Sequence, residues 1–525
     1  MKKEVTFQIF TLGCKVNQYE SEQIREILLT AGFAQTDLEP DWCIVNTCAV
    51  TQESEAKSRR LIRQKIKKHA PKNVLVFGCS AENAQDQYAK IPGVTHVVTA
   101  QNHGGNRVAA VLEALGVRLE ACEAILSGGL RQFGERHRAY VKIQDGCAQF
   151  CTYCLIPHLR NELTSVPPEE VYEEVRSLIR HGYKEIILTG IHLGYYGLNE
   201  RSRSQVVWSI EDRKNPRRTN LTDLMGRLVS IPGEAEFRLR LSSLEAHEAG
   251  DDLLHIMAEN REKICPHLHL SMQSGSPTVH RRMNRPGTVE QYVERCEAAK
   301  KILDHPALTT DVIVGFPGET EKEFLETCDV VRKIGFSKIH IFPFSPRPGT
   351  PAEKMGDSIP GDEKRRRELY LAEIEREMRE KFLAEIADRK KKYLVERFHP
   401  ETGNSNHDGT APADKRQDLV GKYAFLTPEI MIGIHADDGI KPVPRKGHIQ
   451  RVAVNRDDPV LQGKIPDPFQ VVRCVYLEIE GINRFCGGFI HQENRSQCHA
   501  ASKVKRPVIA CVIRIPADQF VQQPE

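Results

Sequence analysis

The stretch Asp145-Gly-Cys-Ala-Gln-Phe-Cys-Thr-Tyr-Cys-Leu-Ile-Pro157 contains three cysteines, separated by three residues and then by two: Cys147, Cys151 and Cys154. Iron–sulfur clusters are normally held by four thiolates. A short loop that offers only three therefore leaves one iron of a cubic four-iron cluster free to bind and reduce a small molecule. A zinc site is the alternative, but zinc usually needs a fourth Cys or His from a second knuckle, and His158 is the nearest candidate.

The length and composition indicate a globular protein of about three or four domains. Of its 525 residues, 40% are hydrophobic and 28% are charged. No run of about eighteen apolar residues could cross a bilayer, and the N-terminus lacks the apolar core of a signal peptide, so we expect a cytoplasmic protein outside the membrane. Its 15 cysteines, an odd number, disfavour a disulfide framework and favour reduced thiols, several of them metal ligands.

The N-terminal region repeats a strand and a helix, and each strand leads to a cysteine. Helices are expected over 19–31 and 53–69, and the strands are expected at 5–14, 43–46 and 73–77, followed by Cys14, Cys48 and Cys79. Ligands of an open parallel α/β sheet lie outside the carboxyl ends of its strands. We therefore predict that the three thiols converge on a second cluster. The alternative is that they are buried core cysteines, which is our interpretation of Cys43.

The central region alternates strand-like and helix-like segments. Six βα repeats are predicted, with strands at 139–144, 185–189, 237–242, 267–272, 309–315 and 338–344. Such alternation predicts a parallel sheet curved into an incomplete barrel, with its active site at the carboxyl ends of the strands. Cys147 follows the first of these strands. The polar segment 199–219 is expected to be an exposed loop.

Several further segments, together with the three-cysteine loop, resemble the methylthiotransferases, a branch of the radical S-adenosylmethionine (SAM) enzymes. The resemblance covers residues 1 to about 375. Its segments are Thr11-Leu-Gly-Cys-Lys-Val-Asn-Gln-Tyr-Glu20, Asn46-Thr-Cys-Ala-Val-Thr51, Gly78-Cys-Ser80, Thr189-Gly-Ile-His-Leu-Gly194, Leu268-His-Leu-Ser-Met-Gln-Ser-Gly275, Asp311-Val-Ile-Val-Gly-Phe-Pro-Gly-Glu319 and Phe342-Pro-Phe-Ser-Pro-Arg-Pro-Gly-Thr-Pro351.

The resemblance implies two [4Fe–4S] clusters and SAM, which serves as radical source and methyl donor. The cluster on Cys147, Cys151 and Cys154 would cleave SAM, and the resulting radical would remove hydrogen from carbon 2 of an adenine. The cluster on Cys14, Cys48 and Cys79 would carry the sulfur that is methylated and transferred. The target base would enter unstacked between the two faces, as base-modifying enzymes require.

Within the family, the phrase around Cys14 most resembles the members that act on N6-threonylcarbamoyladenosine beside the anticodon of tRNA, giving 2-methylthio-N6-threonylcarbamoyladenosine. Isopentenyladenosine in tRNA or a ribosomal protein is the alternative substrate. An iron–sulfur electron carrier or RNA-binding protein is the alternative without catalysis. The resemblance further implies a reductant protein, of the flavodoxin or ferredoxin type, as a partner.

Contacts to SAM are expected from Tyr153, Gly190, Gln273 and Gly315. Glycine at a strand end lets the backbone approach a cofactor closely, although both glycines could equally form turns. Ser274, like Gln273, could serve a substrate or cap a helix. Arg160 beside the loop could orient a carboxylate or a phosphate, although the family usually has glycine where this chain has Asn161.

Three domains are predicted: 1–120 with the second cluster, 133–375 as the radical SAM core, and 376–525 as a small, mostly β, RNA-binding domain of the TRAM type with insertions. After a charged helix at 362–394, strands are expected at 470–479 and 507–515. Cys474, Cys486, Cys498 and Cys511 lack the paired short gaps of a metal site. A basic helix could contact phosphates or simply be solvated; it carries Lys57, Arg59, Arg60, Arg63, Lys65, Lys67 and Lys68.

Overall fold

The computed structural model describes residues 4–100, 105–118, 129–134, 138–198, 220–232 and 236–386, and five short strands beyond them. The chain divides into two compact units, Met1–Glu380 and Lys381–Glu525. The predicted loop at 199–219 lies outside the described residues. The division into three domains stays a prediction.

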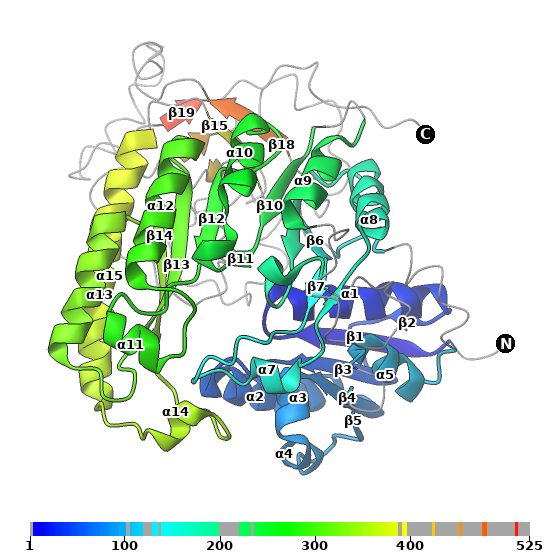
Figure 1. Ribbon diagram of the computed structural model, residues 1–525. Coiled ribbons are helices and arrows are strands. Elements are labelled where there is room, and N and C mark those ends of the chain that lie inside the picture. The colour runs from blue at the N-terminus through cyan, green and yellow to red at the C-terminus, as the bar shows by residue number, and fades with distance from the viewer. Residues whose placement is uncertain are drawn as a thin grey trace, which may run out of the picture. The chain divides into compact units, whose positions relative to one another are not determined.

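The N-terminal part is a parallel sheet whose strand order is β2-β1-β3-β4-β5 (Figure 1). Its three central strands are β1 (Thr6–Thr11), β3 (Trp42–Thr47) and β4 (Asn73–Gly78), and its edges are β2 (Ala34–Gln35) and β5 (His96–Val97). All of the pairings are parallel. The open parallel sheet predicted for this region is therefore confirmed.

Helices cover both faces of this sheet because side chains of a strand alternate between its two faces. On one face Ile44 packs with α1 (Lys15–Thr30) and α5 (Arg107–Ala114). On the other, Cys43 and Val45 pack with α2 (Gln52–His69), α3 (Cys79–Asn83) and α4 (Gln85–Ala89). Cys43 is fully buried, in agreement with its interpretation as a core residue.

The central part is an incomplete barrel of six main parallel strands. They are β6 (Arg138–Lys142), β9 (Glu185–Thr189), β10 (Arg238–Leu241), β12 (His267–Leu270), β13 (Ala307–Val314) and β14 (Lys338–Pro343). They pair as β6-β9-β10 and as β11-β12-β13-β14, where β11 is Ser243–Leu244. A parallel bridge between Leu239 and Ile264 joins the two groups. Among the described residues no pairing returns from β14 to β6, as an incomplete barrel requires.

Amphipathic helices surround the barrel on its outer side (Figure 1). They are α8 (Pro168–Arg180), α9 (Leu221–Val229), α10 (Asp251–Glu259), α12 (Val289–Leu303), α13 (Glu321–Ile334) and α15 (Gly361–Ile386). Capping boxes begin α9, α12 and α13, with Asn220, Thr288 and Thr320 as the first members. These caps satisfy backbone N–H groups that the first helical turn leaves without partners.

Shorter elements lie in the loops. The hairpin of β7 (Gln144–Asp145) and β8 (Thr164–Ser165) encloses the three-cysteine loop and α7 (Ile156–Leu159). Two short helices, α11 (Pro277–Arg282) and α14 (Pro351–Lys354), follow β12 and β14. Two 3₁₀ turns follow β9 and β11, at Leu193–Tyr195 and Ala246–Glu248.

In the second unit, β15 (Lys391–Val395) pairs antiparallel with β18 (Val475–Ile479). The other described strands are β16 (Tyr423–Phe425), β17 (Arg451–Ala453) and β19 (Ala510–Val512). The helix predicted through residue 394 is wrong at its end, because α15 stops at Ile386 and Lys391–Val395 is a strand. Its Tyr-Leu-Val segment has high strand propensity, and β18 supplies a hydrogen-bonding partner that helix periodicity does not reveal.

The predicted strands at 470–479 and 507–515 contain β18 and β19. Cys474, Cys486 and Cys498 lie outside the described residues, as do the surroundings of Cys511. A TRAM-type domain over 376–525 stays a prediction.

The end of β4 has a backbone conformation and a lack of space that only glycine fits at position 78. Its φ is 100°, and an added Cβ would lie 2.4 Å from Asn46 Oδ1 and 2.6 Å from the Thr47 carbonyl oxygen. We expect Gly78→Ala to lower the free energy of unfolding by about 2–3 kcal/mol, through backbone strain and this collision. Chemical denaturation followed by circular dichroism measures the loss.

Gly116→Ala is the matched control, because Gly116 also has a positive φ, 72°, but an added Cβ meets nothing within 4 Å. It should cost about 1 kcal/mol. Equal losses in the two variants would contradict the account of Gly78.

Candidate functional site

Cys14, Cys48 and Cys79, called here the sheet cysteines, lie at the carboxyl ends of adjacent strands. Cys14 precedes α1, Cys48 follows β3, and Cys79 is the first residue of α3, directly after β4. The strand order β1-β3-β4 brings them to one edge of the sheet, where Cys48 Sγ would lie 3.1 Å from a Cβ added at Gly13, the residue before Cys14. The ends of three neighbouring strands thus form one cysteine site, although the residues are far apart in sequence.

Cys147, Cys151 and Cys154, called here the loop cysteines, lie between β7 and α7. Backbone hydrogen bonds fold the loop: Cys147 N–H donates to the Arg160 carbonyl at 3.0 Å, and Cys154 N–H to the Cys151 carbonyl at 2.9 Å. Phe150 adopts a positive φ of 35°. The Gln149 N–H also points at Cys147 Sγ, at 3.4 Å. These hydrogen bonds hold the three cysteines together in one short, folded loop.

Burial favours the protonated form of several of these thiols when no metal is bound. Burial raises the pKa of Cys48 and of Cys154 to about 12 in each case. It also raises the pKa of Cys151. A coordinating metal removes the proton from a thiol, so metal binding at either set would release protons.

Neither cysteine set is among the compact groups of ligand atoms that would suit a single metal ion. In the described part of the chain, three ligand atoms within 4.8 Å of one another occur only at His269, Asp311 and His340. Neither cysteine set is that compact. A tetrahedral zinc ion would draw its sulfurs to roughly 4 Å from one another, given zinc–sulfur bonds of about 2.3 Å. Three cysteines in each set are the donor type of a cubic iron–sulfur cluster, whose thiolates are held on different irons.

Arg160 connects the two cysteine sets. It is 3% exposed, its carbonyl accepts from Cys147, and its Nε lies 3.3 Å from Cys79 Sγ. Its guanidinium donates to both Glu20 carboxylate oxygens, at 2.8 and 2.9 Å, and to both Asp145 oxygens at 2.9 Å. Although burial opposes ionisation, Arg160 and Lys142 hold the pKa of Asp145 far below its usual range.

The expectation that Arg160 orients a bound carboxylate or phosphate does not fit this arrangement. Two protein carboxylates, from α1 and β7, occupy its guanidinium. Arg160 instead holds the edge of the N-terminal sheet against the three-cysteine loop.

Two further pairs beside the loop cysteines were not identified from the sequence. His192 Nδ1 lies 3.5 Å from Cys147 Sγ, and its Nε2 lies 2.6 Å from Glu248. Burial opposes the charge, but hydrogen bonds to Cys147 and Glu248 raise the pKa of His192 to about 10. Arg285 lies 3.6 Å from Cys151 Sγ and pairs with Glu245 at 2.5 Å. Each pair brings a positive charge to a sulfur, where it would stabilise a thiolate.

His192 lies in the segment Thr189–Gly194, which resembles the family, so the sequence could have identified it. No motif in the sequence pointed to Arg285. It follows α11, and only the folding of the chain brings it to the loop.

The four residues expected to contact SAM stay predictions. Tyr153 packs against the apolar cluster that includes Phe316 and Phe344. Gly190 passes close to Gln144, whose Oε1 would lie 2.8 Å from an added Cβ.

The other two lie in tight backbone turns. Gln273 has a φ of 69° and donates its N–H to the Asp311 carbonyl at 2.8 Å. Gly315 donates its N–H to Glu319, and an added Cβ there would lie 2.5 Å from Lys364. Ser274 is fully buried and bonds to Thr327 Oγ1 at 3.2 Å, which favours a structural role.

Comparison with known proteins agrees with this architecture. The model of the radical SAM superfamily matches residues 141–331, and that of the uncharacterized protein family UPF0004 matches residues 6–100. The threonylcarbamoyladenosine tRNA methylthiotransferase MtaB of Bacillus subtilis is 36% identical over 412 residues, which are 76% of this chain and 87% of that protein.

Two other relatives are similar over most of the chain. MtaB of Thermotoga maritima is 34% identical over 74% of this chain and 86% of its own length. The tRNA-2-methylthio-N(6)-dimethylallyladenosine synthase of Acetivibrio thermocellus is 31% identical over 74% of this chain and 80% of its own length.

The barrel, the three-cysteine loop and the family match define a radical SAM enzyme. The N-terminal sheet, with its own three cysteines, is the second part that its relatives share. The chain belongs to the radical SAM methylthiotransferases. The cofactors of this class are SAM and two [4Fe–4S] clusters, as predicted from the sequence. Among the described helices, none has the length and apolar character needed to span a bilayer.

Arg160 gives a direct test of the connection between the two cysteine sets. Arg160→Gln would leave Glu20 and Asp145 without their main cation, and removing one partner of a buried ion pair costs about 3–5 kcal/mol. We expect a loss of that size in the free energy of unfolding, measured by chemical denaturation of the metal-free protein. Arg60→Gln, on the exposed side of α2, is the control and should change stability by less than about 0.5 kcal/mol. A similar small change in both variants would refute the role of Arg160.

Proposed function

We propose that the protein adds a methylthio group to carbon 2 of N6-threonylcarbamoyladenosine beside the anticodon of tRNA, which gives 2-methylthio-N6-threonylcarbamoyladenosine. The main observation behind the proposal is that Arg160 contacts both three-cysteine sets, one in the N-terminal sheet and one in the loop after the first barrel strand. The relatives named as threonylcarbamoyladenosine tRNA methylthiotransferases support this choice of substrate.

In this proposal Cys147, Cys151 and Cys154 hold the cluster that binds SAM, and the sheet cysteines hold the second cluster. When bound, these groups supply the radical and sulfur-transfer chemistry that amino-acid side chains lack. Three thiolates per cluster leave one iron of each available to a ligand that is not protein.

The side chains around the cysteines position them and balance their charge. Arg160 donates to Cys79, Arg285 to Cys151, and His192 lies against Cys147. Each cation is itself held by a carboxylate, so its position is set before any cofactor enters. Such preorganised charges stabilise a buried anionic site without rearrangement during the reaction.

Helix α2 supports contact with the tRNA backbone. Arg60, Arg63, Lys67 and Lys68 are exposed on it, and basic side chains of this kind neutralise phosphates. Lys57 is partly engaged with Glu53, at 3.0 Å. We further propose that the enzyme works in the cytoplasm, where its tRNA substrate is, and that a flavodoxin- or ferredoxin-like protein supplies its electrons.

Iron content tests the two cluster sites separately. With two four-iron clusters the reconstituted protein should hold about eight irons per chain. Replacing all three sheet cysteines by alanine should leave about four, and replacing all three loop cysteines should also leave about four. Cys296→Ala, a core cysteine of α12, is the control and should keep the full amount. Full iron content in either triple variant would remove the basis of the proposal.

Nucleoside analysis tests the substrate. A strain that lacks the gene should accumulate N6-threonylcarbamoyladenosine and lose its 2-methylthio form, because no methylthio group is added. Mass spectrometry of digested tRNA measures both, and a plasmid copy should restore the product. Loss of methylthio-dimethylallyladenosine instead would assign the enzyme to the substrate of its other relatives.

A further inference from the structure

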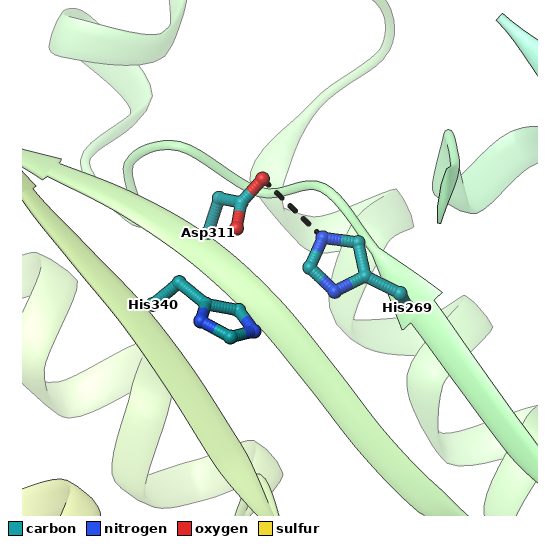
Figure 2. A group of neighbouring side chains, drawn as sticks. All are labelled: His269, Asp311 and His340. Carbon is teal, nitrogen blue, oxygen red and sulfur yellow. Dashed lines mark ion pairs between the residues drawn. The ribbon is translucent and has the colours of Figure 1, made fainter. Parts of the chain in front are cut away.

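A compact group of three side chains that can bind a metal lies inside the barrel, apart from both cysteine sets. His269 on β12, Asp311 on β13 and His340 on β14 each offer one ligand atom, and these atoms lie within 4.8 Å of one another (Figure 2). It is the one such group among the described residues. Three adjacent strands supply the ligands, so paired backbone and not a loop sets their positions.

The strands direct these three side chains into the barrel, because neighbouring residues of a strand point to opposite faces. The apolar neighbours of the three residues belong to the core that includes side chains of α12 and α13; they are Leu268, Leu270, Val312 and Ile339. The three polar side chains therefore face the interior. Asp311 and His340 are also direct partners in the β13–β14 register.

A hydrogen bond on one side of the His269 ring leaves the other side available as a ligand. Its Nδ1 lies 2.9 Å from Thr309 Oγ1, and the hydroxyl proton of Thr309 can itself be directed at His267 Nε2, 3.3 Å away. A histidine that binds a metal almost always donates its second N–H to a partner of this kind. With Nδ1 as the donor, the lone pair of His269 Nε2 faces the carboxylate of Asp311.

The distance between these two groups matches that between two ligands of one ion. His269 Nε2 lies 3.3 Å from Asp311 Oδ2. Nitrogen and oxygen ligands of a tetrahedral zinc ion, with bonds of about 2.0–2.2 Å, lie roughly 3.4 Å apart. The ring of His340 is close by, with its centroid 5.8 Å from that of His269.

The nearby cations on the strands have carboxylates of their own. Lys338, two residues before His340, pairs with Glu375 at 3.6 Å, and Arg240 pairs with Glu185 at 2.7 Å. Within the described ranges, the ion pair with His269 is the only one that Asp311 makes. Its carboxylate is therefore available to a metal ion.

We propose that His269, Asp311 and His340, called here the barrel triad, bind a zinc ion. Imidazole and carboxylate ligands together suit a divalent transition metal, whereas magnesium and calcium prefer oxygen alone. Sites of this kind generally bind zinc more tightly than ferrous iron. Three protein ligands leave one position of the ion open to an outside ligand, as in catalytic zinc sites, whereas structural sites have four.

A proton shared between His269 and Asp311 is the competing interpretation. It would account for their separation of 3.3 Å. It would give no role to His340, whose ring nitrogens make no hydrogen bond to any described residue. A metal ion accounts for all three side chains at once.

The test uses the full-length protein with both clusters reconstituted, so that iron occupies the six cysteines. Dialysis against graded free zinc without oxygen gives the affinity, and elemental analysis gives zinc and iron per chain. X-ray absorption at the zinc edge identifies the ligand atoms. The variants are His269→Gln, Asp311→Asn, His340→Gln and Thr309→Val, and His255→Gln, an exposed histidine of α10, is the matched control.

We expect the wild type and His255→Gln to bind about one zinc ion per chain, through nitrogen and oxygen at about 2.0–2.2 Å. Loss of any one ligand should weaken zinc binding by about 100-fold or more. Thr309→Val removes only the hydroxyl beside His269 and should weaken it by about 10–100-fold, as for other residues that orient a metal ligand. Iron per chain should stay unchanged in every variant.

Three results would overturn the barrel triad. They are a wild type that binds no zinc although its iron is complete, zinc bound through sulfur at about 2.3 Å, or unchanged zinc affinity in the three ligand variants. If the ligand variants lose iron, unchanged zinc affinity in Thr309→Val is the refuting result, and the wild-type spectrum needs no variant. None of these readouts depends on the tRNA substrate, so the proposed function and the zinc site can fail independently.

Discussion

The buried cation of Arg160 is the constraint on which the arrangement of this enzyme depends. An arginine this deeply buried is tolerable only when carboxylates surround it, and Glu20 and Asp145 do so from two different parts of the chain. The same residue meets Cys79 through its side chain and Cys147 through its backbone. Arg160 therefore fixes the positions of both cysteine sets. If either set moved away from it, a buried charge would lose its partner.

The same principle recurs around the other sulfurs. His192 and Arg285 lie beside Cys147 and Cys151, and Glu248 and Glu245 hold them in place. A protein that must accommodate several thiolates in a buried site needs compensating cations, and those cations need anchors of their own.

Much of the fold followed from local patterns. Alternating strand and helix segments predicted the parallel sheet and the six main barrel strands, because hydrophobic periodicity directly reflects which face of an element is buried. The cysteines at 14, 48 and 79 could be placed on one edge because parallel strands all end on the same side. The wrong helix prediction at residues 391–395 has a non-local cause. These residues form a strand because β18 pairs with them, and local periodicity does not reveal a partner about 80 residues away.

The sequence by itself determined the class of enzyme, since the spacing of three cysteines in one loop is a local property of the chain. It also determined the strands that carry the second set. Only the tertiary structure decided that Arg160 binds protein carboxylates and not a ligand, that Arg285 reaches Cys151, and that His269, Asp311 and His340 lie together. These contacts join residues from separate elements, and their energies depend on burial and distance, which exist only once the chain has folded.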